Sequence, residues 1–90
     1  MPVLMIAEVP NLAEETYAGM IGQMTPLFRA AKGFISHSGG PSPSGGWRIV
    51  EAWESEEDSE NFFNEKVRPN VAPDVTPVRT YYPLHTAISK

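Results

Sequence analysis

The sequence contains no cysteine, and its seven lysine and arginine residues are outnumbered by eleven aspartate and glutamate residues. Without cysteine the protein can form no disulfide, no thiolate metal site and no thiol nucleophile. The basic residues are not clustered, and the net charge is -4. This balance argues against binding to nucleic acid and against binding to an anionic membrane.

Long apolar segments are also missing. The first ten residues, MPVLMIAEVP, have no basic region, and their apolar run is too short for a signal peptide or a membrane span. We therefore expect a cytoplasmic protein. Residues 1–90 correspond to a single small domain, and a chain of this size buries only roughly 60–65% of its unfolded surface. A partner subunit would extend so thin a core.

The stretch from Gly45 to Phe63 (GGWRIVEAWESEEDSENFF) is predicted to be a strand that leads directly into a helix. Its first part alternates with the period of two that a strand imposes. Ser55 then begins the sequence SEED, in which a serine cap is followed by acidic residues that favour the positive end of a helix dipole. The residues that share one face of this strand are Trp47, Ile49, Glu51 and Trp53.

Apolar residues at spacings of three and four predict a helix that begins at Asn11 and is closed by Gly33. Asn11 and Glu14 form a capping box, and Pro26 predicts a kink or a short second helix. The helix that begins at Ser55 is stopped by Arg68-Pro69. Further strands are expected at residues 2–8, 34–38 and 78–88, with residues 39–46 (GGPSPSGG) as a long hairpin connection.

The predicted order is β-α-β-β-α-β, so the fold class is α+β with a ferredoxin-like four-stranded antiparallel sheet and both helices on one face. Pro83 within the last strand indicates an edge position or a bulge. The strands are apolar at both parities, with Val3 and Met5 beside Leu4 and Ile6. Because the helices cover only one face, we expect a homodimer that forms through the other sheet face.

The pattern resembles the antibiotic biosynthesis monooxygenase-like family of dimeric α+β barrels. The resemblance implies a cofactor-independent monooxygenase that acts on a hydrophobic aromatic or polyketide-type compound. A polyketide cyclase or isomerase on the same barrel, and a non-catalytic ligand-binding or accessory dimer, are the alternatives. The residues that carry the resemblance are Gly33-Phe34-Ile35 with His37, Gly45-Gly46-Trp47, the run EAWESE from Glu51 to Glu56, Phe62-Phe63 and Pro69.

Haem-degrading members of the family use an asparagine on the first strand and a histidine on the second helix. Here residues 3–8 contain no asparagine and residues 55–68 contain no histidine. The resemblance therefore implies an enzyme without a bound cofactor, in which the substrate itself activates O2.

Three residues are candidates for proton transfer: His37, His85 and Glu51. His37 and His85 are the only histidines, and imidazole exchanges protons near neutral pH. Either could instead be a structural strand residue. Glu51 is expected to be buried, and therefore neutral or paired with an arginine. The two histidines are expected at opposite sheet edges, so no metal site is predicted.

Three aromatic residues are candidates for substrate binding: Trp53, Tyr81 and Tyr82. Trp53 matches the tryptophan position of the family and could stack on a flat substrate, although a large aromatic side chain could equally fill the core. Tyr81 and Tyr82 point to opposite faces of their strand, so one of them is expected to face a cavity. A structural role is the alternative for each.

Overall fold

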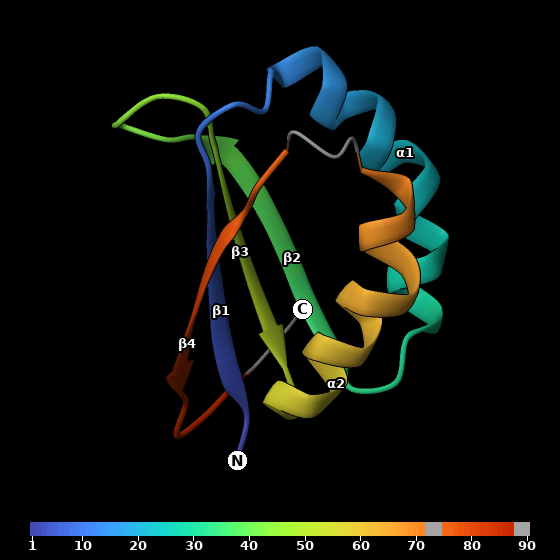
Figure 1. The fold of residues 1–90 in the computed structure, drawn as a ribbon. Helices are drawn as coiled ribbons and strands as arrows, with labels where there is room; N and C mark the ends of the chain where they lie inside the picture. The colour runs from blue at the N-terminus through green and yellow to red at the C-terminus, as the bar shows by residue number, and fades with distance from the viewer. Residues whose placement is uncertain (72–74, 88–90) are drawn as a thin grey trace.

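The computed structural model describes residues 1–71 and 75–87 (Figure 1). The chain begins with strand β1 and helix α1, which are followed by the β2–β3 hairpin, helix α2 and strand β4. Helix α2 continues into a π-helical segment and a 3-10 turn. The bounds are β1 Val3–Val9, α1 Glu14–Ala30, β2 Phe34–Pro41, β3 Trp47–Trp53, α2 Glu56–Phe62, the π-helical segment Phe63–Val67, the 3-10 turn Arg68–Asn70 and β4 Val78–Pro83.

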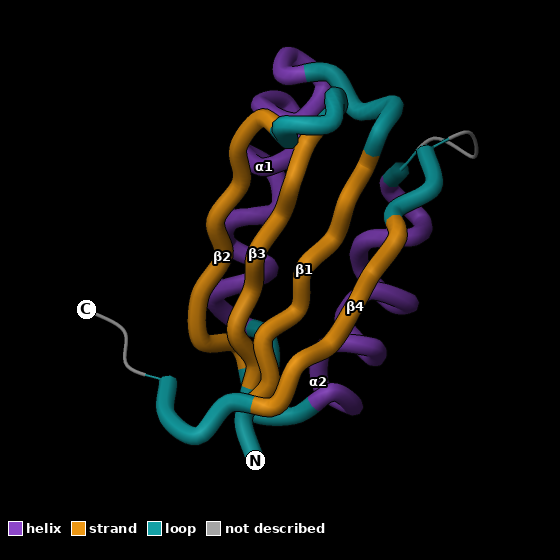
Figure 2. Tube along the Cα trace, turned by 90° about the vertical axis from the view of Figure 1, so that its left-hand side faces the viewer, coloured by secondary structure: helices purple, strands orange, loops and turns teal. Residues whose placement is uncertain are grey.

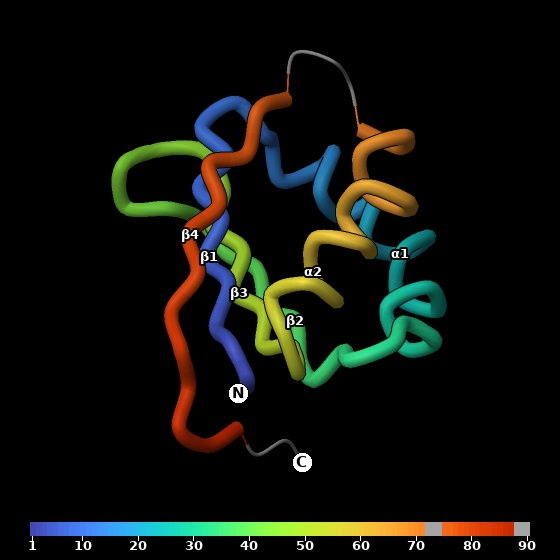
Figure 3. Tube along the Cα trace, turned by 60° about the horizontal axis from the view of Figure 1, so that its bottom comes forward, coloured from blue at the N-terminus to red at the C-terminus, as the bar shows by residue number. Residues whose placement is uncertain are grey.

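The four strands form one antiparallel sheet in the order β2-β3-β1-β4. Figure 2 shows the strands side by side with both helices behind them, and Figure 3 shows the same two layers from another side. Strand β4, which ends at Pro83, is an edge strand as expected. The predicted α+β ferredoxin-like fold is confirmed.

One row of residues across the sheet faces the helices and organises the interior. Glu51 on β3 lies opposite Met5 of β1 on one side and opposite His37 of β2 on the other. Met5 in turn lies opposite Tyr81 of β4. Because side chains alternate between faces, their immediate neighbours in the sequence, such as Tyr82, lie on the face without helices.

The helix-facing residues pack into two apolar clusters, which together form the core. Trp53 is the most deeply buried large residue, with 0% of its surface exposed. The ring centroids of Phe28 and Phe62 lie 6.5 and 5.4 Å from that of Trp53, so both helices close over this end of β3. The buried members of the first cluster are Met5, Ala7, Val9, Leu12 and Trp47, and those of the second are Met24, Phe28, Trp53 and Phe62.

The two helix N-termini differ in how well the sequence predicted them. The cap of α2 is confirmed, because the Ser55 hydroxyl accepts a hydrogen bond from the Asp58 N–H at 3.1 Å. The capping box of α1 is wrong: Ala13 is the N-cap and makes no side-chain cap bond. A turn closed by the Leu12 N–H and the Val9 carbonyl comes first. That turn buries Leu12 in the core, and this packing delays the start of the helix.

Helix α1 runs without interruption through Pro26, so the alternative of a second short helix is wrong. Proline cannot donate the hydrogen bond that the Gly22 carbonyl would otherwise accept. Both Pro26 and Gly22 are exposed, so water can replace that bond on the solvent side of the helix.

The connection between β2 and β3 is shorter than expected. Gly39, Gly40 and Pro41 continue β2 and pair with Ile49, Arg48 and Trp47, which leaves only residues 42–46 as the loop. At the other end of the chain β4 stops at Pro83, whereas a strand over residues 78–88 was expected. Its predicted last residue lies outside the described residues.

Candidate functional site

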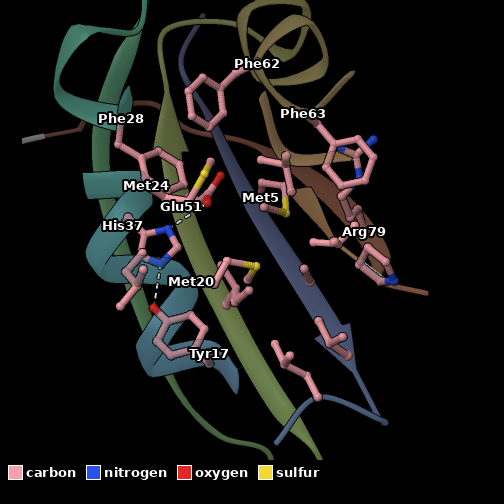
Figure 4. Close-up of a pocket in the computed structure, with 18 of the residues that line it drawn as sticks. Met5, Tyr17, Met20, Met24, Phe28, His37, Glu51, Phe62, Phe63 and Arg79 are labelled. Atoms are coloured by element: carbon pink, nitrogen blue, oxygen red, sulfur yellow. Dashed lines mark hydrogen bonds and ion pairs between the residues drawn. The ribbon is translucent and has the colours of Figure 1, made fainter. Parts of the chain in front are cut away.

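A cavity lies between the sheet and the two helices (Figure 4). It comprises about 700 Å³ of atom-free space, open solvent included, of which water could fill about 70 Å³. That is room for several water molecules, since one ordered water needs about 10–15 Å³. The lining is mainly apolar and includes Met5, Ala7, Met20, Met24, Phe28 and Phe62.

A chain of hydrogen bonds runs along one side of this cavity. The Tyr17 hydroxyl lies 2.7 Å from Nε2 of His37, and Nδ1 of His37 lies 2.7 Å from Oε2 of Glu51. Oε1 of Glu51 accepts a hydrogen bond from the indole N–H of Trp53 at 2.8 Å. Tyr17, His37 and Glu51 all line the cavity (Figure 4), whereas Trp53 is not among its lining residues. We call Tyr17, His37 and Glu51 the relay.

The hydrogen-bond partners set the direction of the relay. Burial raises the pKa of Tyr17, and the negative charge of Glu51 raises it further. The Glu51 carboxylate can only accept hydrogen bonds, so Nδ1 of His37 carries the proton that it donates to Oε2. In the neutral imidazole Nε2 then carries the lone pair and accepts the hydrogen bond from the Tyr17 hydroxyl, whose raised pKa keeps its proton in place at neutral pH. His37 is thus oriented as a base toward Tyr17, and the Glu51 carboxylate accepts a hydrogen bond from its other ring nitrogen.

The fold holds the relay rigidly. His37 and Glu51 occupy directly opposed positions of the β2–β3 hairpin, and only 12% and 9% of their side-chain surfaces are exposed. The ring of Phe28 packs on His37 at a centroid distance of 4.6 Å. The ring of Tyr17 lies within 9° of parallel to that of His37. Charge interactions are stronger in such a dry setting than in water.

A second polar group lies on the other side of the cavity. Arg79, which lines the cavity, donates to both carboxylate oxygens of Glu60 at 2.8 Å and stacks on the Phe63 ring at 3.8 Å. Tyr81 donates to Glu60 at 2.8 Å and lies 2.9 Å from the Ser59 hydroxyl. Figure 4 shows Arg79 and Phe63 across the cavity from the relay.

These contacts shift the pKa of two groups in this second network. Burial opposes ionisation of Glu60, but hydrogen bonds from Tyr81 and Arg79 outweigh it and lower the pKa of the carboxyl. Burial raises the pKa of Tyr81 to about 12, against the opposing effect of its hydrogen bond with Ser59. Arg79 is therefore neutralised by an ionised partner, and Tyr81 remains a hydrogen-bond donor.

The structure brings together only part of the residues that the sequence singled out. His37 and Glu51 meet in the relay, but Glu51 pairs with His37 and Trp53, and the expected arginine partner is wrong. Tyr81 faces the helices and Tyr82 is exposed on the opposite face.

His85 and Trp53 lie outside the cavity lining. His85 was predicted on the last strand, but it follows β4, is exposed, and its Nδ1 contacts the Thr86 hydroxyl. The strand assignment is wrong because β4 ends at Pro83. Trp53 is fully buried, so it supports Glu51 and does not form a cavity wall.

Tyr17 was missed as a site residue, because the sequence shows it only as one member of the apolar face of a helix. The signal that could have led to the relay is the hairpin register, since a loop over residues 42–46 places His37 opposite Glu51. No comparable signal in the sequence links Tyr17 to His37, which lies 20 residues away.

Within residues 1–71 and 75–87, no group of three or more histidine and carboxylate side chains could hold a metal ion. In the same residues no helix has the length and apolar character needed to cross a membrane.

No protein-family model matches the sequence, and no curated protein matches it significantly. Solved structures do match. Rv0793 from Mycobacterium tuberculosis superposes with a TM-score of 0.73 at 19% identity, covering 99% of this chain and 100% of that protein. SnoaB, a cofactor-independent oxygenase from Streptomyces nogalater, does so with a TM-score of 0.67 at 8% identity, covering 99% and 98%.

A proposed monooxygenase from Shewanella loihica is a further match, with a TM-score of 0.63 at 17% identity and 96% coverage of both chains. Identities this low establish a common fold and leave the chemistry to the site. The chain therefore shares the α+β fold of these three proteins.

Proposed function

We propose that the protein is a cofactor-independent monooxygenase of the antibiotic biosynthesis monooxygenase-like family. Its substrate would be a small hydrophobic aromatic or polyketide-type compound with an acidic C–H or O–H group. The observation that carries the proposal is the relay of Tyr17, His37 and Glu51, which borders an otherwise apolar cavity. A base that faces an apolar space suits the removal of a proton from a neutral organic molecule.

The first step uses the relay as it stands. The substrate proton passes to the Tyr17 oxygen while the Tyr17 proton passes to Nε2 of His37, 2.7 Å away. The imidazolium that forms is stabilised by Glu51, whose two oxygens are held by His37 and by Trp53. Since burial raises the pKa of Tyr17, the two transfers are coupled and no free tyrosinate accumulates.

The second step consumes O2. For a CH2 group beside an aromatic ring, the electron pair left by the proton forms a C–O bond to O2. The resulting peroxide takes a proton back from the relay. Loss of the second hydrogen of that carbon then breaks the O–O bond, which gives a carbonyl group and water. The substrate is oxidised by four electrons and O2 accepts all four, so no further reductant is needed.

The cavity walls suit such a substrate. A substrate bound against these apolar walls would displace water, which would otherwise quench the carbanion by returning a proton. The space that water could fill is small, but Met5, Met20 and Met24 line it. Methionine is unbranched and adapts its shape readily, so these side chains can make room for a flat ring. They support an aromatic substrate without selecting one compound.

We further propose that the protein is a homodimer formed through the sheet face that carries no helices. Tyr82 is 49% exposed and Val78 is 64% exposed on this face. Leu4, Ile6 and Val50 are partly buried apolar residues beside them. An apolar face of this kind is normally covered, and a two-fold axis would pair it with itself.

Oxygen uptake on a panel of anthrones, hydroquinones and phenols tests the activity. The His37→Ala variant should lose activity by about 100- to 10,000-fold, the usual contribution of a general base. Tyr17→Phe should also lose activity, because it interrupts the proton path. His85→Ala serves as the matched control, since this histidine is exposed after β4, and it should retain the wild-type rate.

Other results would redirect the assignment. Conversion of an enolisable ketone without oxygen uptake, lost in His37→Ala, would identify an isomerase or cyclase that uses the same relay. If no compound of either kind reacts with the folded protein above the uncatalysed rate, the proposal of an enzyme is wrong, and a ligand-binding or accessory role would replace it.

A further inference from the structure

The position of the Tyr17 hydroxyl depends on a glycine in β2. A Cβ atom on Gly39 would lie 2.4 Å from the Tyr17 oxygen and 2.6 Å from its Cζ, so the phenol packs directly on the glycine backbone. Gly39 has no positive φ angle and pairs with Ile49 in the sheet. The backbone therefore does not require glycine here. The glycine is needed because it leaves room for Tyr17, which is one reason for glycine within a strand.

The neighbouring Gly40 shows that this requirement is local. It belongs to the same strand and has no positive φ angle. A Cβ atom on Gly40 would meet nothing within 4 Å. Of these two adjacent glycines, only Gly39 makes room for the relay.

Trp47 lies close to both Gly39 and Tyr17. Its indole Nε1 would be 2.9 Å from the Gly39 Cβ position, and its ring centroid lies 5.0 Å from that of Tyr17. Trp47 is only 8% exposed, and its N–H has no hydrogen-bond partner among the described residues. Leaving a buried donor unpaired costs about 1–3 kcal/mol, so this N–H requires an explanation.

We propose that Gly39 and Trp47 are positioning residues that make Tyr17 a proton-transfer group. Gly39 leaves the space in which the hydroxyl reaches His37. The unpaired N–H of Trp47 stabilises the negative charge that develops on the Tyr17 oxygen as its proton moves to His37. A donor fixed in advance where charge will form is the arrangement that stabilises oxyanions in active sites. The inference rests on the function proposed above for the relay.

Three effects act on the pKa of Tyr17 in the absence of substrate. Burial raises the pKa of Tyr17 and the charge of Glu51 adds to this, whereas the Trp47 N–H lowers it. Among the described residues, the other titratable groups at the cavity are His37 on β2, Glu51 on β3 and Arg79 on β4. Helix α1 contributes Tyr17 itself and Arg29, which lines a neighbouring pocket together with Tyr17, His37 and Gly39. Removal of the N–H should therefore raise the pKa of the phenol further.

The first experiment needs no substrate. The residue 3-fluorotyrosine is placed at position 17, where fluorine lowers the phenol pKa into an accessible range and gives a single 19F NMR signal. The titration is then repeated in Trp47→Phe. We expect a higher pKa at position 17 in this variant. An unchanged titration in a folded Trp47→Phe protein would overturn the role of the N–H, whether or not the enzyme proves to be an oxygenase. If that variant does not fold, site-specific replacement of Trp47 by its benzothiophene analogue removes the N–H and keeps the ring.

The second experiment compares Gly39→Ala with Gly40→Ala. Gly39→Ala should displace the hydroxyl, shift the 19F signal and reduce oxygen uptake by about tenfold or more, since a misplaced proton donor loses most of its effect. Gly40→Ala should leave both unchanged. The pH profile of uptake should move to higher pH in Trp47→Phe and remain in place in Gly40→Ala. Equal uptake and equal 19F shifts in the two alanine variants would disprove the role of Gly39. If Gly39→Ala and Gly40→Ala give the same 19F shift, this inference is wrong. If none of the proteins, wild type included, consumes oxygen, the proposed function is wrong.

Discussion

The Nδ1 atom of His37 lies 2.7 Å from a carboxylate oxygen of Glu51, although 14 positions of sequence separate the two residues. The contact arises because β2 and β3 pair with these residues directly opposite each other. A base and its carboxylate are thereby fixed by backbone hydrogen bonds of the sheet, and not by flexible loops. This arrangement holds His37 in place as the proposed base.

Glu51→Gln should destabilise the protein and impair the relay. Both oxygens of Glu51 accept hydrogen bonds, one from His37 and one from Trp53. A glutamine offers only one acceptor, so its amide N–H2 would face one of these donors. We expect the free energy of unfolding, measured with urea, to fall by about 1–3 kcal/mol. Glu54→Gln changes an exposed glutamate nearby and should have no such effect. Equal stability of the two variants would show that the hydrogen bonds of Glu51 contribute little.

Ala7→Leu should reduce ligand binding by filling the cavity. Ala7 lines the cavity and is only 2% exposed, so the added carbon atoms must enter the space available for substrate. We expect a smaller rise in Tm when an anthrone or hydroquinone is added, because ligand binding stabilises the folded state in proportion to occupancy. Overpacking itself costs about 1–3 kcal/mol of stability.

The matched control for the cavity is Ala18→Leu, which adds the same group at an exposed position of α1. Its ligand-dependent Tm shift should equal that of the wild type. A full shift in Ala7→Leu would mean that the ligand binds elsewhere on the protein.

Local chemistry was sufficient to predict much of the fold. The hydroxyl of Ser55 has a suitable N–H three residues later, so the start of α2 follows from four residues of sequence. Strand β3 follows from its alternation. The start of α1 could not be predicted in this way, since Leu12 is drawn into a turn by contacts with the distant core cluster around Trp47.

The site was less predictable because it depends on strand register. Gly39, Gly40 and Pro41 have the composition of a turn, but they pair with β3. A loop that started at residue 39 would place His37 opposite Arg48, on the wrong face for a contact with Glu51. Glycine also has a low strand propensity, but at position 39 a larger residue would clash with the ring of Tyr17. Such a contact between distant elements leaves no local pattern in the sequence.

Val50→Glu should convert the proposed dimer into a monomer. Val50 lies opposite Ile6 in the middle of the face without helices, and a two-fold interface would bury two such glutamates against each other without partners. Light scattering coupled to size-exclusion chromatography should give twice the chain mass for the wild type and one chain mass for the variant. Leu27→Glu, at an exposed position of α1, should remain dimeric. A monomeric wild-type protein would refute the sheet-face dimer.

Tyr81→Phe should remove part of the loss of stability at alkaline pH. The pKa of Tyr81 is about 12 in the folded protein, mainly because of burial, against a usual value of 10. As pH rises from 10 toward 12, the unfolded chain releases this proton while the folded chain retains it. The unfolded state then binds fewer protons, so the free energy of unfolding decreases across this window. The contribution of Tyr81 is fully present below pH 10.

Urea unfolding of both proteins at a series of pH values provides the measurement. Below pH 10 the phenylalanine variant should be less stable by a constant amount, because it lacks the hydrogen bonds to Glu60 and Ser59. Between pH 10 and 12 the two curves should converge, since only the wild type loses the contribution of this phenol. The other tyrosines and the lysines titrate in both proteins and cancel in the difference. Curves that stay parallel through pH 12 would show that Tyr81 titrates alike in the folded and unfolded chains, and therefore that burial does not raise its pKa in the folded protein.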